Sequence, residues 1–209
     1  MKFFDCATAP NPRRVRIFLA EKGVAIPTQQ IDLAGGEQFS PSFRAINPRC
    51  SVPVLVLDDG TAISDVLAIC RYIEDLHPSP ALMGTSPKDK AVIAMWERRM
   101  EVDGLLAAAE ALRNSAPRLK GRALVGPHDY EQIPALAERG RARLLDFYND
   151  LELRLADSPF VAGPEFSVAD ITAIVAVDFA TRIKLPMPDG AKAVRRWYEA
   201  MSARPSMSV

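Results

Sequence analysis

The sequence predicts an α/β domain followed by an all-α domain, and three observations indicate this. Up to about residue 77, short apolar runs alternate with helical patterns. Residues 78–87 then contain three prolines and one glycine, which the interior of a helix or strand would not tolerate. Beyond this stretch the apolar spacing is helical almost throughout. We therefore expect an α/β domain at residues 1–77, a linker at 78–87 and an all-α domain at 88–209.

The first domain is predicted to hold one small sheet covered by helices. Residues 2–6 form a short apolar run that indicates a strand, which must end before the prolines of the next loop. Periodic apolar residues at 15–20, closed by Lys22 and Gly23, indicate a helix with a glycine C-cap. Three further strands and a second helix are predicted, at residues 26–33, 52–57, 61–63 and 65–76. This order describes a single α/β sheet.

The second domain is predicted to contain long helices around a buried one. Apolar residues recur at three- and four-residue spacing over 91–111 and 133–155, whereas residues 167–182 are apolar on several faces. A helix that is apolar all round belongs in the centre of a bundle. Ser167 and Asp170, placed ahead of it, form a capping box that we interpret as a folding device.

Charge and cysteine content exclude several classes of function. The chain carries 26 basic and 26 acidic side chains, so it lacks the basic field that would attract nucleic acid or an anionic membrane. Its three cysteines and two histidines show no metal-ligand spacing, which predicts free thiols in a reducing compartment and no metal site. No apolar run approaches the roughly 18 residues of a membrane span, and no signal pattern opens the chain. We therefore expect a cytoplasmic protein.

Three segments resemble the cytosolic glutathione S-transferase family, in the same order and spacing. Residues 47–55 (NPRCSVPVL) resemble its Asn-Pro-x-x-x-Val-Pro-x-Leu segment, and residues 64–73 (SDVLAICRYI) resemble the helix that follows. Residues 162–171 (AGPEFSVADI) resemble the start of the family's buried helix. The resemblance covers nearly the whole chain. It implies a thioredoxin-like N-terminal domain, an all-α C-terminal domain, glutathione as co-substrate and a homodimer.

The resemblance implies that glutathione binds at two places in the first domain. A cis Val52–Pro53 bond would leave the Val52 N–H and C=O free to pair with a peptide-like ligand, although a proline that merely ends a turn is the alternative. At the start of the next helix, Asp65 would meet the ligand's ammonium and Val66 its carboxylate. The family usually has Glu and Ser at these two positions, so we expect weaker binding. An Asp65 that only stabilises the helix start is the alternative.

The group that activates the glutathione thiol must lie between residues 6 and 14. The free thiol has a pKa of about 8.5, so a hydrogen-bond donor or a positive field must favour its thiolate. At the family's catalytic hydroxyl position this chain has Ala9. The Thr8 hydroxyl, the Asn11 amide and backbone N–H groups near Ala9 are the candidate replacements. Cys6 could instead form a mixed disulfide, and a chain without thiol activation is the remaining alternative.

The other candidate residues lie in the second domain and at the remaining cysteines. The resemblance implies that the first long helix lines a dimer interface on one side and the electrophile pocket on the other. Met100, Asp103 and Leu106 are candidates for that pocket, with ordinary packing as the alternative. We interpret Cys70 as a core residue and expect Cys50 to lie exposed in a loop, and neither is expected to be catalytic.

These expectations lead to one function and two rivals. The favoured function is a detoxifying glutathione transferase, in which the glutathione thiolate attacks a small apolar electrophile. The first rival is a non-catalytic binding or scaffold protein, because the same fold does not guarantee the same function. The second rival is a glutathione-dependent thiol reductase or peroxidase that works through Cys6.

Overall fold

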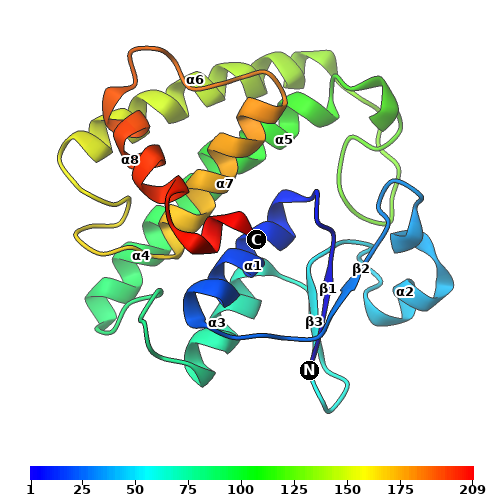
Figure 1. Cartoon of the computed structure of the whole chain (residues 1–209). Coiled ribbons are helices and arrows are strands. Elements are labelled where there is room, and N and C mark those ends of the chain that lie inside the picture. The colour runs from blue at the N-terminus through cyan, green and yellow to red at the C-terminus, as the bar shows by residue number, and fades with distance from the viewer. The chain divides into compact units, whose positions relative to one another are not determined.

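A computed structural model describes residues 1–209, and the chain divides into two compact units (Figure 1). The first unit contains Met1–Pro80, Leu124–Asp129 and Val209, and the second contains Ala81–Ala123 and Tyr130–Ser208. No local pattern in the sequence indicates that residues 124–129 belong with the first unit. None of the helices is long and apolar enough to cross a membrane.

The first unit is built on a four-stranded mixed sheet with the strand order β2-β1-β3-β4. Its strands are β1 (Lys2–Asp5), β2 (Thr28–Gln30), β3 (Val54–Val56) and β4 (Ala62–Ile63). β1 pairs parallel to β2 and antiparallel to β3, and β3 pairs antiparallel to β4. Its helices are α1 (Pro10–Lys22), α2 (Pro41–Ile46) and α3 (Val66–Leu76), with a short 3-10 turn η1 (Glu37–Phe39). This β-α-β unit followed by a hairpin and a helix is the predicted thioredoxin-like arrangement.

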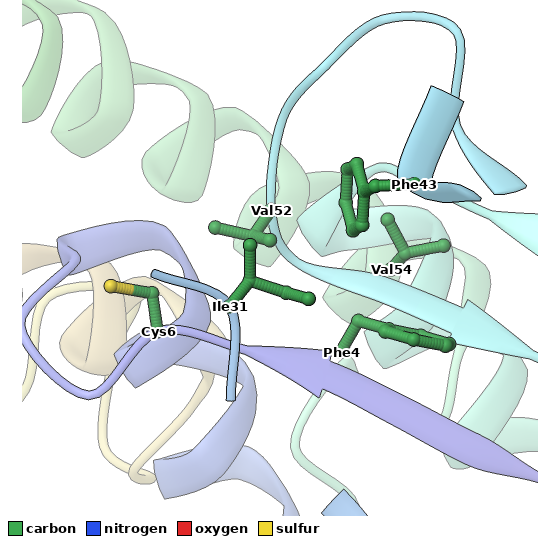
Figure 2. Close-up of a cluster of buried hydrophobic side chains, with 6 residues drawn as sticks. All are labelled: Phe4, Cys6, Ile31, Phe43, Val52 and Val54. Carbon is green, nitrogen blue, oxygen red and sulfur yellow. The ribbon is translucent and has the colours of Figure 1, made fainter. Parts of the chain in front are cut away.

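The two faces of this sheet are covered by different helices (Figure 1). On one face Phe43 of α2 packs edge-on against Phe4 of β1, with ring centroids 6.1 Å apart. Val54 of β3 lies opposite Phe4 in the sheet and joins the same cluster (Figure 2). Because side chains alternate along a strand, Phe3 and Leu55 point to the other face, where α1 and α3 pack together.

Two local features of the first unit differ from the sequence analysis. The predicted strand at 26–33 is confirmed only at β2, because Pro27 has no amide hydrogen and the Leu33 N–H turns back to the Ile31 carbonyl at 3.0 Å. Helix α2 was not predicted, because its six residues are too few to show a period. Its N-cap is Ser40, whose hydroxyl accepts from the Phe43 N–H at 3.2 Å. The predicted glycine cap of α1 is confirmed, since Gly23 has a φ of 64°.

The second unit is helical, as predicted. Its long helices are α4 (Pro87–Arg99), α5 (Leu106–Arg113), α6 (Pro134–Ala156), α7 (Val168–Arg182) and α8 (Lys192–Ser202). A π-helical segment, η2 (Met100–Leu105), joins α4 to α5 in one continuous rod. The rod agrees with the helix predicted over 91–111, but its π-helical segment was not predicted. Short 3-10 turns lie at η3 (Pro117–Leu119) and η4 (Pro205–Ser208).

Two glycines allow close helix packing in this unit. A Cβ atom on Gly104 of η2 would lie 2.7 Å from the Phe147 ring, and one on Gly140 of α6 would lie 2.7 Å from the Ala111 backbone nitrogen. Side chains are excluded at both positions, since real Cβ atoms do not approach that closely. The glycines therefore fix how near α6 comes to the rod formed by α4, η2 and α5.

Helix α7 is the buried helix that the sequence predicts, and its N-terminus is fully satisfied. The Ser167 hydroxyl accepts from the Ala169 N–H at 3.3 Å, and one Asp170 oxygen accepts from the Ser167 N–H at 3.1 Å. The other Asp170 oxygen accepts from the Val161 N–H at 2.9 Å and from the Trp197 indole N–H at 3.0 Å. Burial is the dominant effect on this carboxyl and raises the pKa of Asp170 to about 6, against the hydrogen bonds that lower it. The predicted capping box is confirmed.

Candidate functional site

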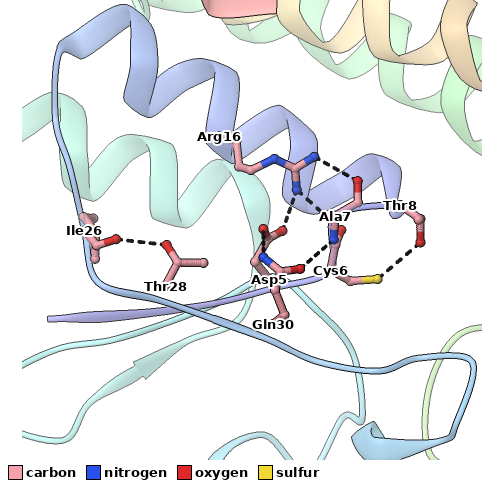
Figure 3. A network of polar contacts seen from close by, with 8 residues as sticks. All are labelled: Asp5, Cys6, Ala7, Thr8, Arg16, Ile26, Thr28 and Gln30. Atoms are coloured by element: carbon pink, nitrogen blue, oxygen red, sulfur yellow. Dashed lines mark hydrogen bonds and ion pairs between the residues drawn. The ribbon is translucent and has the colours of Figure 1, made fainter. Parts of the chain in front are cut away.

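The loop between β1 and α1 is held in place by a polar network (Figure 3). Asp5, at the end of β1, is buried and accepts from Arg16 Nη1 and from Gln30 Nε2, each at 2.6 Å. Arg16 Nη2 also donates to the Ala7 carbonyl at 3.1 Å, while Gln30 Oε1 accepts from the Ala7 N–H at 2.8 Å. Both backbone polar groups of Ala7 are thereby fixed by side chains from α1 and β2.

Helix α1 begins directly after this loop, and its N-terminus is open. Ala9 occupies the N-cap position and makes no side-chain cap, and its own N–H donates to the Cys6 carbonyl at 3.0 Å. Pro10 and Pro12 carry no amide hydrogen. Of the first three residues of α1, Asn11 is therefore the one that has a backbone N–H. No hydrogen bond within the chain uses this N–H.

The two side chains predicted to activate the thiol both lie at this junction. Thr8 is exposed, and its hydroxyl oxygen lies 3.5 Å from Cys6 Sγ. Asn11 is half-buried, and its Oδ1 accepts from Arg14 Nη1 at 3.1 Å. No acceptor within the chain takes the Asn11 Nδ2 hydrogens. Asn11 thus presents a backbone donor and a side-chain donor that are both unused.

The cysteines are all buried, and none forms a disulfide. Cys6 is 8% exposed and extends the apolar cluster beside Ile31 and Val52 (Figure 2). Cys70 lies in the core, in agreement with its interpretation. The expectation that Cys50 is exposed was wrong, since the residue is 3% exposed.

A compact turn explains the burial of Cys50. The buried Asn47 side chain donates to the Ser51 carbonyl at 2.8 Å and accepts from the Arg49 N–H at 3.0 Å. Cys50 lies inside this turn in a left-handed conformation, with a φ of 52°. A sequence that reads as a loop can therefore still place its side chain in the core.

The Val52–Pro53 peptide follows this turn and is cis. Val52 is buried and precedes β3, which begins at Val54. No hydrogen bond within the chain uses the Val52 backbone N–H or C=O. An extended segment can therefore pair with this position as an added strand.

At the start of α3, Asp65 caps the helix. Its Oδ1 accepts from the Ala68 N–H at 2.9 Å, as a helix-stabilising N-cap does. Asp65 is exposed, and its second carboxylate oxygen has no partner within the chain. Val66 is the first residue of α3, so its N–H is among the donors without an acceptor inside the helix. Capping and ligand binding are thus compatible at this position.

A groove of about 460 Å³ lies in the second unit, between the rod and α6. Of the three residues named as candidates for an electrophile pocket, Met100 and Asp103 line this groove, whereas Leu106 does not and is 46% exposed. The guanidinium groups of Arg99 and Arg154 each lie 4.8 Å from the Trp96 ring centre. The remaining lining residues are Phe147, Asp150 and Leu153. The groove is therefore lined by apolar side chains together with arginine and aspartate side chains.

Sequence reasoning missed the residues that hold the site in place. Asp5, Arg16 and Gln30 act through contacts between positions up to 25 residues apart, which no local spacing reveals. The one available signal was the pair Arg14 and Arg16 on either side of the apolar Val15, because a charged group that is buried with apolar residues needs a partner. No group of three or more His, Cys, Asp or Glu side chains is placed to hold a metal ion.

Comparisons with known proteins identify the family. The glutathione S-transferase N-terminal domain model matches residues 8–76, and the C-terminal domain model matches residues 134–200. Glutathione S-transferase 2 of Saccharomyces cerevisiae is 38% identical over 99% of this chain and 88% of its own length. The crystal structure of Gtt2 from the same yeast has a TM-score of 0.91 and 37% identity, covering 100% of this chain and 99% of the other. A glutathione S-transferase domain-containing protein of Marinobacter aquaeolei has a TM-score of 0.90 and 37% identity over 99% of this chain and 100% of its own. The chain belongs to the glutathione S-transferase family.

Proposed function

We propose that this protein is a glutathione transferase that stabilises the glutathione thiolate at the open N-terminus of α1. The observation that carries the proposal is the pair of unused donors on Asn11, in a family member whose usual hydroxyl position is Ala9. In a site from which water is excluded, two preorganised donors favour the anionic form of a bound thiol. The missing hydroxyl therefore does not by itself remove the means of activation.

Glutathione is expected to bind along the first unit through its backbone and its γ-glutamyl end. Its central peptide pairs with the open N–H and C=O of Val52, ahead of Pro53. The α-carboxylate of its γ-glutamyl residue meets the Val66 N–H at the positive end of α3. The ammonium of the same residue meets the unused Asp65 oxygen. Binding in this register brings the cysteinyl sulfur to the start of α1.

The chemical step needs little from the protein beyond positioning and charge stabilisation. The thiol proton leaves to water, and the sulfur lone pair then forms a bond to the electrophilic carbon while the bond to the leaving group breaks. We propose Asn11 ahead of Thr8 as the main donor, because the Thr8 hydroxyl lies against Cys6 Sγ whereas both donors of Asn11 are unused. Buried Cys6 has no observation in its favour as a redox nucleophile.

We propose that the groove of the second unit accepts a small apolar electrophile. The Met100 side chain and its aromatic neighbours supply apolar contact, and Asp103 stands at the same wall. A Met100→Ala variant should raise KM for the electrophile several-fold, because it removes a few buried methylene groups from the contact with the electrophile. KM for glutathione should stay unchanged. An unchanged KM for every electrophile tested would remove the groove from the site.

We also propose a homodimer in a reducing, cytoplasmic setting. The rod and α6 expose four large apolar side chains, and such residues are common at self-association surfaces. They are Met95, Leu106, Leu145 and Leu153. Light scattering after size exclusion should give twice the chain mass of 22.9 kDa. A monomer at micromolar concentration would contradict this part of the proposal.

The function is tested by measuring glutathione binding by calorimetry together with conjugation of an aryl halide. Binding with turnover is expected. Binding without turnover of any electrophile would favour the non-catalytic scaffold, and no binding at millimolar glutathione would overturn the proposal. A Cys6→Ser variant should keep its turnover, whereas loss of activity together with a glutathione adduct on wild-type Cys6 would favour the reductase alternative.

A further inference from the structure

We propose that Arg14 is a positioning residue that fixes which end of the Asn11 amide faces the glutathione sulfur. The two side chains lie three residues apart on α1, so they share one face of the helix. Arg14 Nη1 donates to Asn11 Oδ1 at 3.1 Å. The inference rests on the proposed function, in which the glutathione sulfur binds at the start of α1.

The orientation of the Asn11 amide follows from hydrogen-bonding chemistry. A guanidinium group has donors and no acceptor, and it stays protonated at every relevant pH. The amide oxygen must therefore face Arg14, which turns the Nδ2 hydrogens in another direction. Rotation of the amide by 180° would place two donors against each other and direct an oxygen toward the thiolate, where it would oppose ionisation.

Burial makes this arrangement rigid. Arg14 is 1% exposed and is one of the largest fully buried side chains of the protein. Its guanidinium group cannot move into water when the site is empty, in contrast to a surface arginine. The Asn11 donors are therefore set before glutathione arrives, and no reorientation is needed when the thiolate forms.

Arg14 and Arg16, two of the three arginines of α1, thus have separate tasks. Arg16 binds Asp5 and the Ala7 carbonyl and so holds the loop before the helix. Arg14 holds the amide at the first turn of the helix. Arg16 therefore sets the path of the backbone, whereas Arg14 sets the orientation of the Asn11 amide.

The test is a double-mutant cycle on Arg14 and Asn11, read as the pKa of the bound glutathione thiol from its ultraviolet thiolate absorbance. Asn11→Ala should raise this pKa by about one unit and lower kcat/KM by about tenfold at neutral pH. Arg14→Met should raise it by a similar amount in the wild-type chain and by very little in the Asn11→Ala chain. Coupling of this kind shows that Arg14 acts through Asn11.

Two results would overturn the proposal, and a third concerns the proposed function. If the shifts caused by Arg14→Met are equal in both backgrounds, or if Arg14→Met alone has no effect, Arg14 does not position the amide. If Asn11→Ala itself leaves the thiol pKa unchanged, Asn11 is not the donor and the proposed function needs another one. Arg44→Met, an exposed arginine on α2, is the control that should change nothing.

A conservative variant keeps the test usable if Arg14→Met does not fold. Arg14→Lys retains a charged donor group whose direction is less fixed, so its effect on the thiol pKa should be smaller than that of Asn11→Ala. That effect should again vanish in the Asn11→Ala background. A thermal unfolding scan on each variant separates a loss of fold from a loss of thiol activation.

Discussion

The N-termini of α1 and α7 are built in opposite ways. At α7, Ser167 and Asp170 take up backbone and indole donors, and the helix start is buried and closed. At α1, Ala9 provides no cap, and the donors of Asn11 are unused. The comparison shows that a helix start can serve either of two purposes. A helix start satisfied from within stabilises the fold, whereas one left open provides a place for an anion.

Helix α3 lies between these extremes. Its cap residue Asp65 uses one oxygen on the helix and exposes the other. The first unit therefore contains one open and one half-open helix start, at the two places where the sulfur and the γ-glutamyl end of glutathione are proposed to bind.

The largest expected effect is on the free energy of unfolding, when the capping carboxylate at the N-terminus of α7 is removed. Asp170→Ala leaves the Val161 N–H and the Trp197 indole N–H buried without an acceptor, and should lower the free energy of unfolding by about 4 kcal/mol. Urea unfolding measures the loss. The exposed counterpart Asp89→Ala, from the capping box of α4, should cost much less. Equal losses for the two variants would contradict the account of a buried, closed helix start.

The next effect is a pH dependence at the same carboxyl group. Burial raises the pKa of Asp170 to about 6 from its ordinary 3.8, so the folded protein keeps a proton that the unfolded chain has already lost. Between about pH 4 and about pH 6 the free energy of unfolding should therefore fall as pH rises, by at most about 3 kcal/mol from this group, and then level off. Asp170→Asn should lack this component. A component of the opposite sign would mean that the hydrogen bonds outweigh burial.

A third experiment closes the open terminus. Ala9→Asp supplies an N-cap acceptor for the Asn11 N–H, which should stabilise the fold by up to about 1 kcal/mol. The added negative charge beside the sulfur should lower kcat/KM by about tenfold or more. Stability and activity are thus expected to change in opposite directions. Ala9→Gly is the matched control, and a fall in activity there as large as in Ala9→Asp would argue against the role of charge.

The smallest expected effect concerns the loop that precedes α1. Gln30→Ala removes two hydrogen bonds, to Asp5 and to the Ala7 N–H, and should cost about 1 kcal/mol of unfolding free energy. It should also raise KM for glutathione by about two- to fivefold, because the loop is then less fixed. The neighbouring Gln29 makes neither contact, so Gln29→Ala should leave the unfolding free energy and the KM for glutathione unchanged. Steady-state kinetics and urea unfolding distinguish these outcomes.

The sequence was sufficient for features that depend on neighbouring residues. The glycine cap at Gly23 and the capping box of Ser167 and Asp170 are local signals, and the structure confirms both. The absence of a hydroxyl at Ala9 is likewise visible without coordinates.

The features that the sequence did not reveal depend on contacts between distant positions. The bridge from Gln30 to Ala7 joins β2 to the first loop, and the burial of Cys50 follows from a turn closed by Asn47. The π-helical segment η2 sits where Gly104 meets Phe147, 43 residues further along the chain, and so has no local signature. Candidate residues could be named from the sequence, but the way they are held could not.

The central claim is that the open start of α1 activates the glutathione thiol. The most direct measurement is the pKa of the glutathione thiol when it is bound to the wild-type protein, followed by its thiolate absorbance as pH is raised. The account predicts a value at least one unit below the free thiol's value of about 8.5. A bound thiol that titrates at the value of free glutathione would contradict it.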